Sequence, residues 1–95
     1  MTTGTTASGT YYLYNKKVQD VPIVFVHGVG LTHEIWQPQL EFFNYHSTLA
    51  YDILGHGKSS LENKEISFDN FSDQLITLVD HLNIKKIHLV GFSIG

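Results

Sequence analysis

The sequence predicts an α/β fold with a mostly parallel sheet, and two observations support this. Short runs of β-branched and aromatic residues have the continuity of strands that are buried on both faces. Segments with apolar residues at helical spacing separate these runs, and such alternation is typical of βαβ units with right-handed crossovers. The three runs are VPIVFV (21–26), HSTLAYDI (46–53) and KIHLV (86–90). We predict that they are neighbours in the sheet, with the last beside the first.

The N-terminal residues precede this pattern and are predicted to add one strand. Residues 1–9 are small and polar, so we expect a flexible lead-in. Residues 10–17 read TYYLYNKK, which favours a strand and ends in charge, as edge strands often do. Residues 10–95 are then expected to form one domain, because a chain of 95 residues holds at most one small core.

Two helices are predicted between the strands. Residues 33–43 place apolar side chains at helical spacing, although Pro38 indicates a helix that is kinked or starts late. The second helix has better-defined ends, because Ser67 is a suitable N-cap and Asn83 marks its stop. Its apolar stripe consists of Phe68, Phe71, Leu75, Leu78, Val79 and Leu82.

Composition argues against several classes of protein. The net charge is −3, arginine is absent, and the only paired lysines are Lys16 with Lys17 and Lys85 with Lys86, too few for a nucleic-acid footprint. The absence of cysteine excludes disulfides and thiolate metal sites. The N-terminus lacks a secretory signal, and no apolar stretch approaches the ~18 residues of a membrane span. We expect a cytoplasmic protein with no cofactor, metal, nucleic-acid or membrane partner. The sequence leaves its oligomeric state open.

Three glycine-bearing loops follow the predicted strands. They are HGVG (27–30), LGHGKSS (54–60) and GFSIG (91–95). The carboxyl ends of parallel strands share one edge of a sheet, and ligands of open α/β sheets bind outside that edge. We therefore expect Val29, Gly57 and Ser93 to converge at one end of the sheet.

Nucleotide-binding motifs are incomplete in these loops. Two loops begin as G-x-G, but His33 and Ser60 stand where the third glycine of a dinucleotide fingerprint belongs. Residues 57–59 read GKS, as at the end of a phosphate-binding P-loop, but the first glycine of that motif would fall at Asp52. A small nucleotide-binding α/β domain is therefore the weakest functional interpretation.

The third loop completes a catalytic motif. Residues 91–95 match G-x-S-x-G, in which a sharp strand-to-helix turn exposes a nucleophilic serine. Together with VFVHGVGLTHEIWQPQL (24–40) and YDILGHGKSS (51–60), this motif resembles the N-terminal part of an α/β-hydrolase, similar to the family's cofactor-free esterases and lactonases. The resemblance covers roughly residues 12–95. It departs at Leu54, where the family often carries arginine.

The resemblance implies roles for particular residues and a small-molecule acyl substrate. Ser93 would be the nucleophile that attacks an acyl carbonyl. The backbone N–H groups of Val29 and Ile94 would form the oxyanion hole. Three further residues would orient the loops: His27, Gly28 and His56. The other histidines show no metal-binding spacing, so no metal site is expected.

In this family the acid and the histidine of the triad follow the serine in the chain. Only Ile94 and Gly95 follow Ser93, so we expect a fold truncated after the nucleophile elbow and a chain with little activity of its own. A non-catalytic remnant or an interaction module is the alternative from another class. The coding sequence beyond Gly95 would separate these interpretations, because a hydrolase needs a downstream Asp or Glu and then a His.

Overall fold

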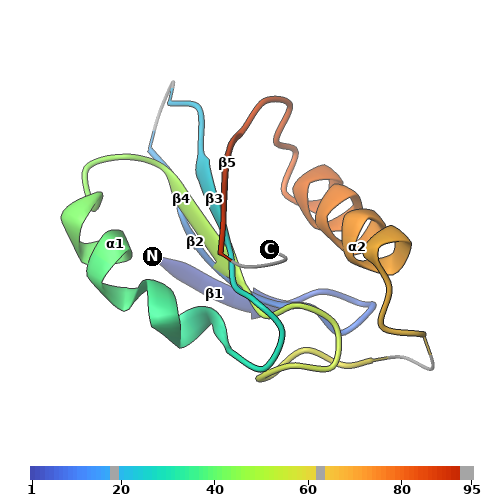
Figure 1. The fold of residues 1–95 in the computed structure, drawn as a ribbon. Coiled ribbons are helices and arrows are strands. Elements are labelled where there is room, and N and C mark those ends of the chain that lie inside the picture. Colours follow the sequence, from blue (N-terminus) through green and yellow to red (C-terminus); the bar gives the residue numbers. More distant parts are fainter. Residues whose placement is uncertain (18–19, 62–63, 93–95) are drawn as a thin grey trace.

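The computed structural model describes residues 1–17, 20–61 and 64–92. Within them, a five-stranded mixed sheet has the order β1-β2-β4-β3-β5, with helices on both faces (Figure 1). The strands are β1 (Thr2–Thr5), β2 (Tyr11–Asn15), β3 (Ile23–Val26), β4 (Thr48–Tyr51) and β5 (His88–Gly91). The helices are the 3₁₀ turn η1 (His33–Trp36), α1 (Gln37–Phe42) and α2 (Phe68–His81). No helix among these residues has the length and apolar character needed to cross a bilayer.

The centre of the sheet is parallel. Strand β3 pairs in parallel with β4 on one side and with β5 on the other. In this register Val24 lies between Leu49 of β4 and Leu89 of β5. The prediction that the three apolar runs are neighbours, with the last beside the first, is confirmed.

The N-terminal strands differ from the prediction. Strand β2 is antiparallel to both β1 and β4, so it lies inside the sheet and is not an edge strand. The edge is β1, and Thr2–Thr5 are therefore not an unstructured lead-in. Backbone pairing with β2 supports this polar strand, and Gly4 lets it approach the Tyr12 ring, since a Cβ at Gly4 would lie 2.7 Å from the Tyr12 hydroxyl.

Both predicted helices form, and their ends follow from local chemistry. Pro38 stands in the first turn of α1, where its missing N–H is tolerated, and the turn η1 precedes it, so the helix does start late. Ser67 caps α2 by accepting a hydrogen bond from the Asn70 N–H at 3.2 Å. Asn83 has φ 59°, a left-handed conformation that stops the helix.

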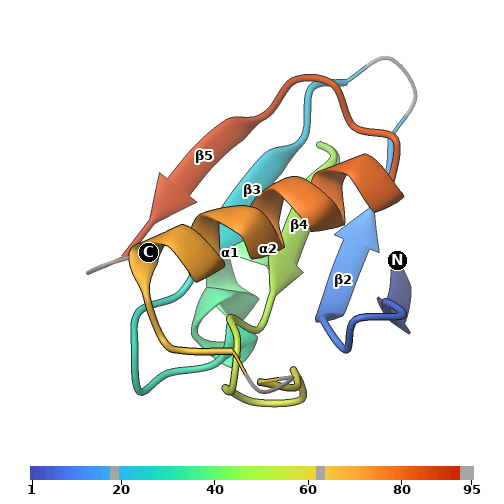
Figure 2. The same ribbon diagram turned by 90° about the vertical axis from the view of Figure 1, so that its right-hand side faces the viewer.

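The core lies on both faces of the sheet and centres on β4. On the α2 side, Val24, Leu49 and Tyr51 pack with Leu78. On the α1 side, Phe25 and Ala50 pack with Trp36 and Leu40. All four residues of β4 are buried, and Figure 2 shows α2 lying across this part of the sheet.

Strand β5 corrects a further expectation. The apolar run at 86–90 predicts a buried strand, but every residue of β5 is exposed, including Leu89 at 55% and Val90 at 38%. The cause is its place in the sheet: within the described residues β5 pairs only with β3, so its outer edge has no neighbour.

Candidate active site

The loop after β3 forms a tight turn. The Leu31 N–H donates to the Gly28 carbonyl at 3.1 Å, and Gly30 has φ 89°, which together define a type II turn with Val29 at its second position. Such a turn needs glycine at the third position. Val29 is 51% exposed, and its N–H has no acceptor within the described residues. Within the described part of the chain, the turn therefore presents the Val29 N–H without an acceptor at the carboxyl end of the sheet.

His27 joins this turn to the loop after β4. Its ring is fully buried; Nδ1 donates to the Gly28 carbonyl at 2.8 Å and Nε2 accepts from the Ile53 N–H at 3.1 Å. An Nε2 that accepts a hydrogen bond carries no proton, so the ring is neutral. Burial lowers the pKa of His27 below its ordinary value, and the contact with the Gly28 carbonyl and the charge of Asp52 only partly oppose this.

His56 holds the turn from the other side. Its Nδ1 donates to the Leu54 carbonyl at 2.8 Å, and its Nε2 accepts from the Gly30 N–H at 3.0 Å. The rings of His27 and His56 lie 5.5 Å apart, centroid to centroid. Both histidines thus use both ring nitrogens to connect the two loops. A loop-orienting role remains a prediction, and these contacts are the ones that such a role requires.

Asp52, a buried residue just after β4, anchors the same two loops. One carboxylate oxygen accepts from the His33 N–H at 2.7 Å and from His33 Nδ1 at 2.8 Å, and the other accepts from the Lys58 N–H at 2.9 Å. Burial alone would raise the pKa of Asp52, but these hydrogen bonds hold it below its ordinary value. Gly57, with φ 50°, packs directly on this carboxylate, and a Cβ there would collide with it.

Two residues that were not predicted from the sequence complete this network. The Gln74 amide accepts from the Leu54 N–H at 3.0 Å and donates to the Asp52 carbonyl at 3.1 Å. The Ser59 hydroxyl donates to the same carbonyl at 2.6 Å. Because it is polar, Gln74 is expected off the apolar stripe of α2, but the structure buries it. Its spacing was the signal, since it stands three residues after Phe71 and four before Leu78.

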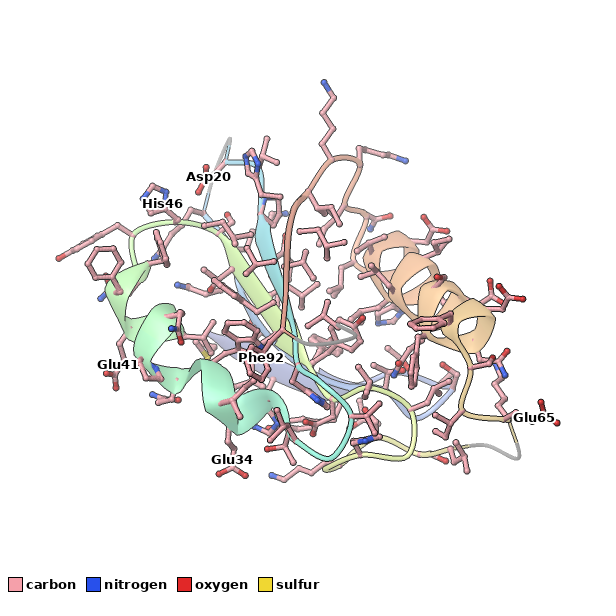
Figure 3. The ribbon with its side chains drawn as sticks, viewed as in Figure 1. Asp20, Glu34, Glu41, His46, Glu65 and Phe92 are labelled. Atoms are coloured by element: carbon pink, nitrogen blue, oxygen red, sulfur yellow. The ribbon has the colours of Figure 1, made fainter. Side chains whose placement is uncertain are left out.

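Two apolar hollows flank the end of β5. One, of ≈ 130 Å³, is lined by His27, Tyr51 and Phe71 among others, and burial raises the pKa of the Tyr51 hydroxyl. The other, of ≈ 350 Å³, lies between Trp36 and Phe92, and Figure 3 labels Phe92 at the end of β5. The described residues contain no group of three or more acidic, histidine or cysteine side chains that could hold a metal ion.

The predicted site residues fall into two groups. The structure brings His27, Gly28, Val29 and His56 together at the carboxyl ends of β3 and β4, and Gly57 lies on the same loops. Ser93 and Ile94 lie outside the described residues, so their convergence with Val29 stays a prediction. The last described residue before them, Phe92, donates its N–H to the Val26 carbonyl at 3.1 Å, beside the start of the turn.

Comparison with known proteins gives consistent matches. Residues 21–95 match the family described as alpha/beta hydrolase fold. The (E)-2-((N-methylformamido)methylene)succinate hydrolase of Acinetobacter baylyi is 34% identical over 83 residues, 86% of this chain and 32% of that protein. The 3-oxoadipate enol-lactonase 1 of the same organism is 36% identical over 75 residues, 77% of this chain and 27% of that protein.

A solved structure agrees with these relatives. The crystal structure of a hydrolase from Pseudomonas aeruginosa superposes with a TM-score of 0.84 at 25% identity, over 99% of this chain and 37% of that one. The chain spans about a third of the length of the proteins it matches.

Proposed function

The chain belongs to the α/β-hydrolase-fold family, and on that premise we propose that Ser93 is the nucleophile of a serine hydrolase for esters, lactones or similar acyl compounds. The relatives named above are a hydrolase and an enol-lactonase, which supports ester-like substrates. The observation that carries the proposal is the turn at Gly28–Leu31, which leaves the Val29 N–H without an acceptor among the described residues, at the edge of the sheet where β5 ends.

In the proposed reaction Ser93 Oγ forms a bond to the acyl carbon while its proton passes to a base. The carbonyl oxygen becomes an oxyanion, which the N–H groups of Val29 and Ile94 would stabilise. The alcohol or enol leaving group departs with that proton, and water then attacks the acyl-enzyme by the same route. A free N–H is what this step requires of Val29, because a donor already bonded within the protein would have to break that bond first.

The histidines of the described residues are poor general bases as they stand. His27 and His56 each have both ring nitrogens engaged, so protonating either ring would break a hydrogen bond from a backbone N–H. His33 differs, since its Nδ1 contacts Asp52 and its Nε2 has no hydrogen-bond partner within the described residues. We expect little hydrolysis from residues 1–95 alone, because an unassisted serine hydroxyl is a weak nucleophile.

The test is active-site labelling with a fluorophosphonate, together with turnover of p-nitrophenyl acetate. Two proteins are compared: residues 1–95, and the same residues expressed with any coding sequence that continues beyond Gly95. The proposal expects labelling in the extended protein that Ser93→Ala abolishes, and little in residues 1–95. Labelling of the extended protein that survives Ser93→Ala would contradict it.

The same assay locates a base within residues 1–95 if that shorter chain turns out to be active. His33→Gln should then abolish turnover, because the ring of His33 is the one held by a carboxylate with a nitrogen left over. His46→Gln is the matched control, since that side chain is 58% exposed and lies 3.7 Å from Asp20 at the other end of the molecule.

A further inference from the structure

Two pairs of lysines meet at the end of the sheet opposite the candidate active site. Lys16 and Lys17 follow β2, and Lys85 and Lys86 precede β5, so about seventy residues separate the pairs in the sequence. All four line one pocket of ≈ 330 Å³. The chain has six lysines and no arginine, so two thirds of its fixed positive charge lies around this pocket.

The pocket has an apolar floor beneath these cations. Pro22 and Ile84 line it and are buried, and Tyr14 and Leu82 line it and are half-buried. Burial raises the pKa of the Tyr14 hydroxyl, which is therefore neutral at pH 7 and adds no negative charge. The segments that meet here precede β3, follow β2 and join α2 to β5, at the upper end of the sheet in Figure 1.

The lysines of the pocket form no ion pair with the described residues. Among the described residues, none of the four lysines lies within 4.0 Å of a carboxylate. Of the described residues that line the pocket, Asp20 is the one acid, and its Oδ2 already accepts from the Ser47 N–H at 2.7 Å and lies 3.7 Å from His46 Nδ1. Asp80, in the last turn of α2, is not part of the lining.

Charge is therefore separated along the molecule. Four lysines against one aspartate give the pocket a net charge of +3. The rest of the chain carries two lysines and eight acidic residues, a net charge of −6. With the +3 of the pocket this gives the total of −3. A hollow in which one sign of charge predominates focuses the potential and raises the local concentration of ions of opposite sign.

We propose that this pocket binds a small organic anion, whose carboxylate or phosphate group contacts the lysines and whose apolar body rests on Pro22 and Ile84. The volume lies within the range of small-molecule sites, about 300–1,000 Å³. The apolar floor distinguishes such a ligand from inorganic phosphate, which would gain nothing from it. A small ligand also fits the charge better than a nucleic acid, since four lysines without arginine make a short footprint.

The proposal does not depend on the proposed hydrolase function. The pocket lies at the amino ends of β3 and β5, whereas the turn at Gly28–Leu31 follows the carboxyl end of β3. Figure 3 shows the same separation, with Asp20 at one end of the molecule and Glu34 of η1 at the other. Either site can fail its test without affecting the other.

The test is an NMR titration of the ¹⁵N-labelled chain with phenylphosphonate, in which the chemical shifts of the backbone amides are monitored. Two further probes each keep one feature of phenylphosphonate: inorganic phosphate keeps the charge, and benzyl alcohol keeps the aromatic ring. Saturable shifts confined to residues 14–17 and 82–86 are expected, with weaker binding of both partial probes. Lys85→Gln combined with Lys86→Gln should weaken phenylphosphonate binding by about tenfold. The control pair, Lys58→Gln with Lys64→Gln, removes the same charge outside the pocket and should leave the affinity unchanged.

Three outcomes would overturn the proposal. The first is the absence of saturable shifts at these residues. The second is equal binding of inorganic phosphate and phenylphosphonate, which would mean that the apolar floor plays no part. The third is binding of a dT₁₀ oligonucleotide or of polyglutamate through the same lysines with no binding of phenylphosphonate, which would mark a surface for a macromolecule. Circular dichroism of both lysine variants verifies that each is folded.

Discussion

Strands β4 and β5 are both parallel neighbours of β3 and have the same length, yet their surroundings are opposite. Every residue of β4 is buried and every residue of β5 is exposed. Val24 shows the contrast within one register, because Leu49 beside it is 0% exposed and Leu89 on its other side is 55% exposed. Figure 2 shows β4 within the sheet and β5 at its side.

The two strands lead into different parts of the candidate site, and these parts differ in how well they are packed. Strand β4 leads into Asp52, and the loops around that carboxylate are held by partly buried hydrogen bonds to His33 and Lys58. Strand β5 leads toward Ser93 with little packing to support it. Rigidity in the described residues therefore belongs to the Val29 turn and the loop that braces it, and the proposed nucleophile follows the least buried strand.

The largest expected effect sets Leu49→Ala against Leu89→Ala. Removing a fully buried leucine side chain leaves a cavity, so Leu49→Ala should lower the free energy of unfolding by about 2–5 kcal/mol. Leu89→Ala should lower it by less than about 1 kcal/mol, because the side chain is mostly in solvent already. Urea unfolding followed by circular dichroism measures both. Equal losses would mean that β5 is as well packed as β4, and the contrast would fail.

A second comparison lies within the loops. Gly57→Ala should lower the free energy of unfolding by more than about 2 kcal/mol, since it combines a positive φ with a Cβ that collides with the Asp52 carboxylate. Gly30→Ala is the matched control: φ is also positive, but no atom lies within 4 Å of the added Cβ, so backbone strain of about 1 kcal/mol is all that is expected. The midpoints of thermal denaturation of the two variants measure this difference. The reverse order would show that Asp52 does not anchor the loop.

Much of this architecture could be predicted from local patterns. The strand runs, the Ser67 cap and the stop at Asn83 depend on neighbouring residues, so the sequence reveals them. Strand β1 could not be predicted, because a polar segment becomes a strand only through its pairing with β2. The burial predicted from the composition of residues 86–90 is wrong for a similar reason, since apolar composition indicates a capacity for burial and the neighbouring elements decide it.

The candidate site divides in the same way. The glycine turn and the two connecting histidines lie in recognisable motifs. The contacts of Asp52 with His33, and of Gln74 with Thr10, join residues 19 and 64 positions apart. Such partners are chosen by tertiary packing, which no local spacing records.

A smaller effect is expected in the pH dependence of stability. Burial lowers the pKa of His27, so below its ordinary value of 6.5 the unfolded chain binds a proton that the folded ring does not. The free energy of unfolding should therefore fall as the pH drops from 6.5 toward the folded pKa. Urea midpoints at about pH 7.5 and about pH 5.5 measure the slope. His27→Gln should flatten it, whereas His46→Gln should not; a slope unchanged by His27→Gln would contradict the assignment.

One substitution tests directly whether the Val29 N–H serves as an oxyanion donor. Proline suits the second position of a type II turn, so Val29→Pro keeps the turn at Gly28–Leu31 and removes only the N–H. In whichever protein the labelling and turnover assays show to be active, Val29→Pro should lower kcat for p-nitrophenyl acetate by about 10²–10³, with Val29→Ala close to the unsubstituted protein. Equal activity of the proline and alanine variants would show that the Val29 N–H stabilises no oxyanion.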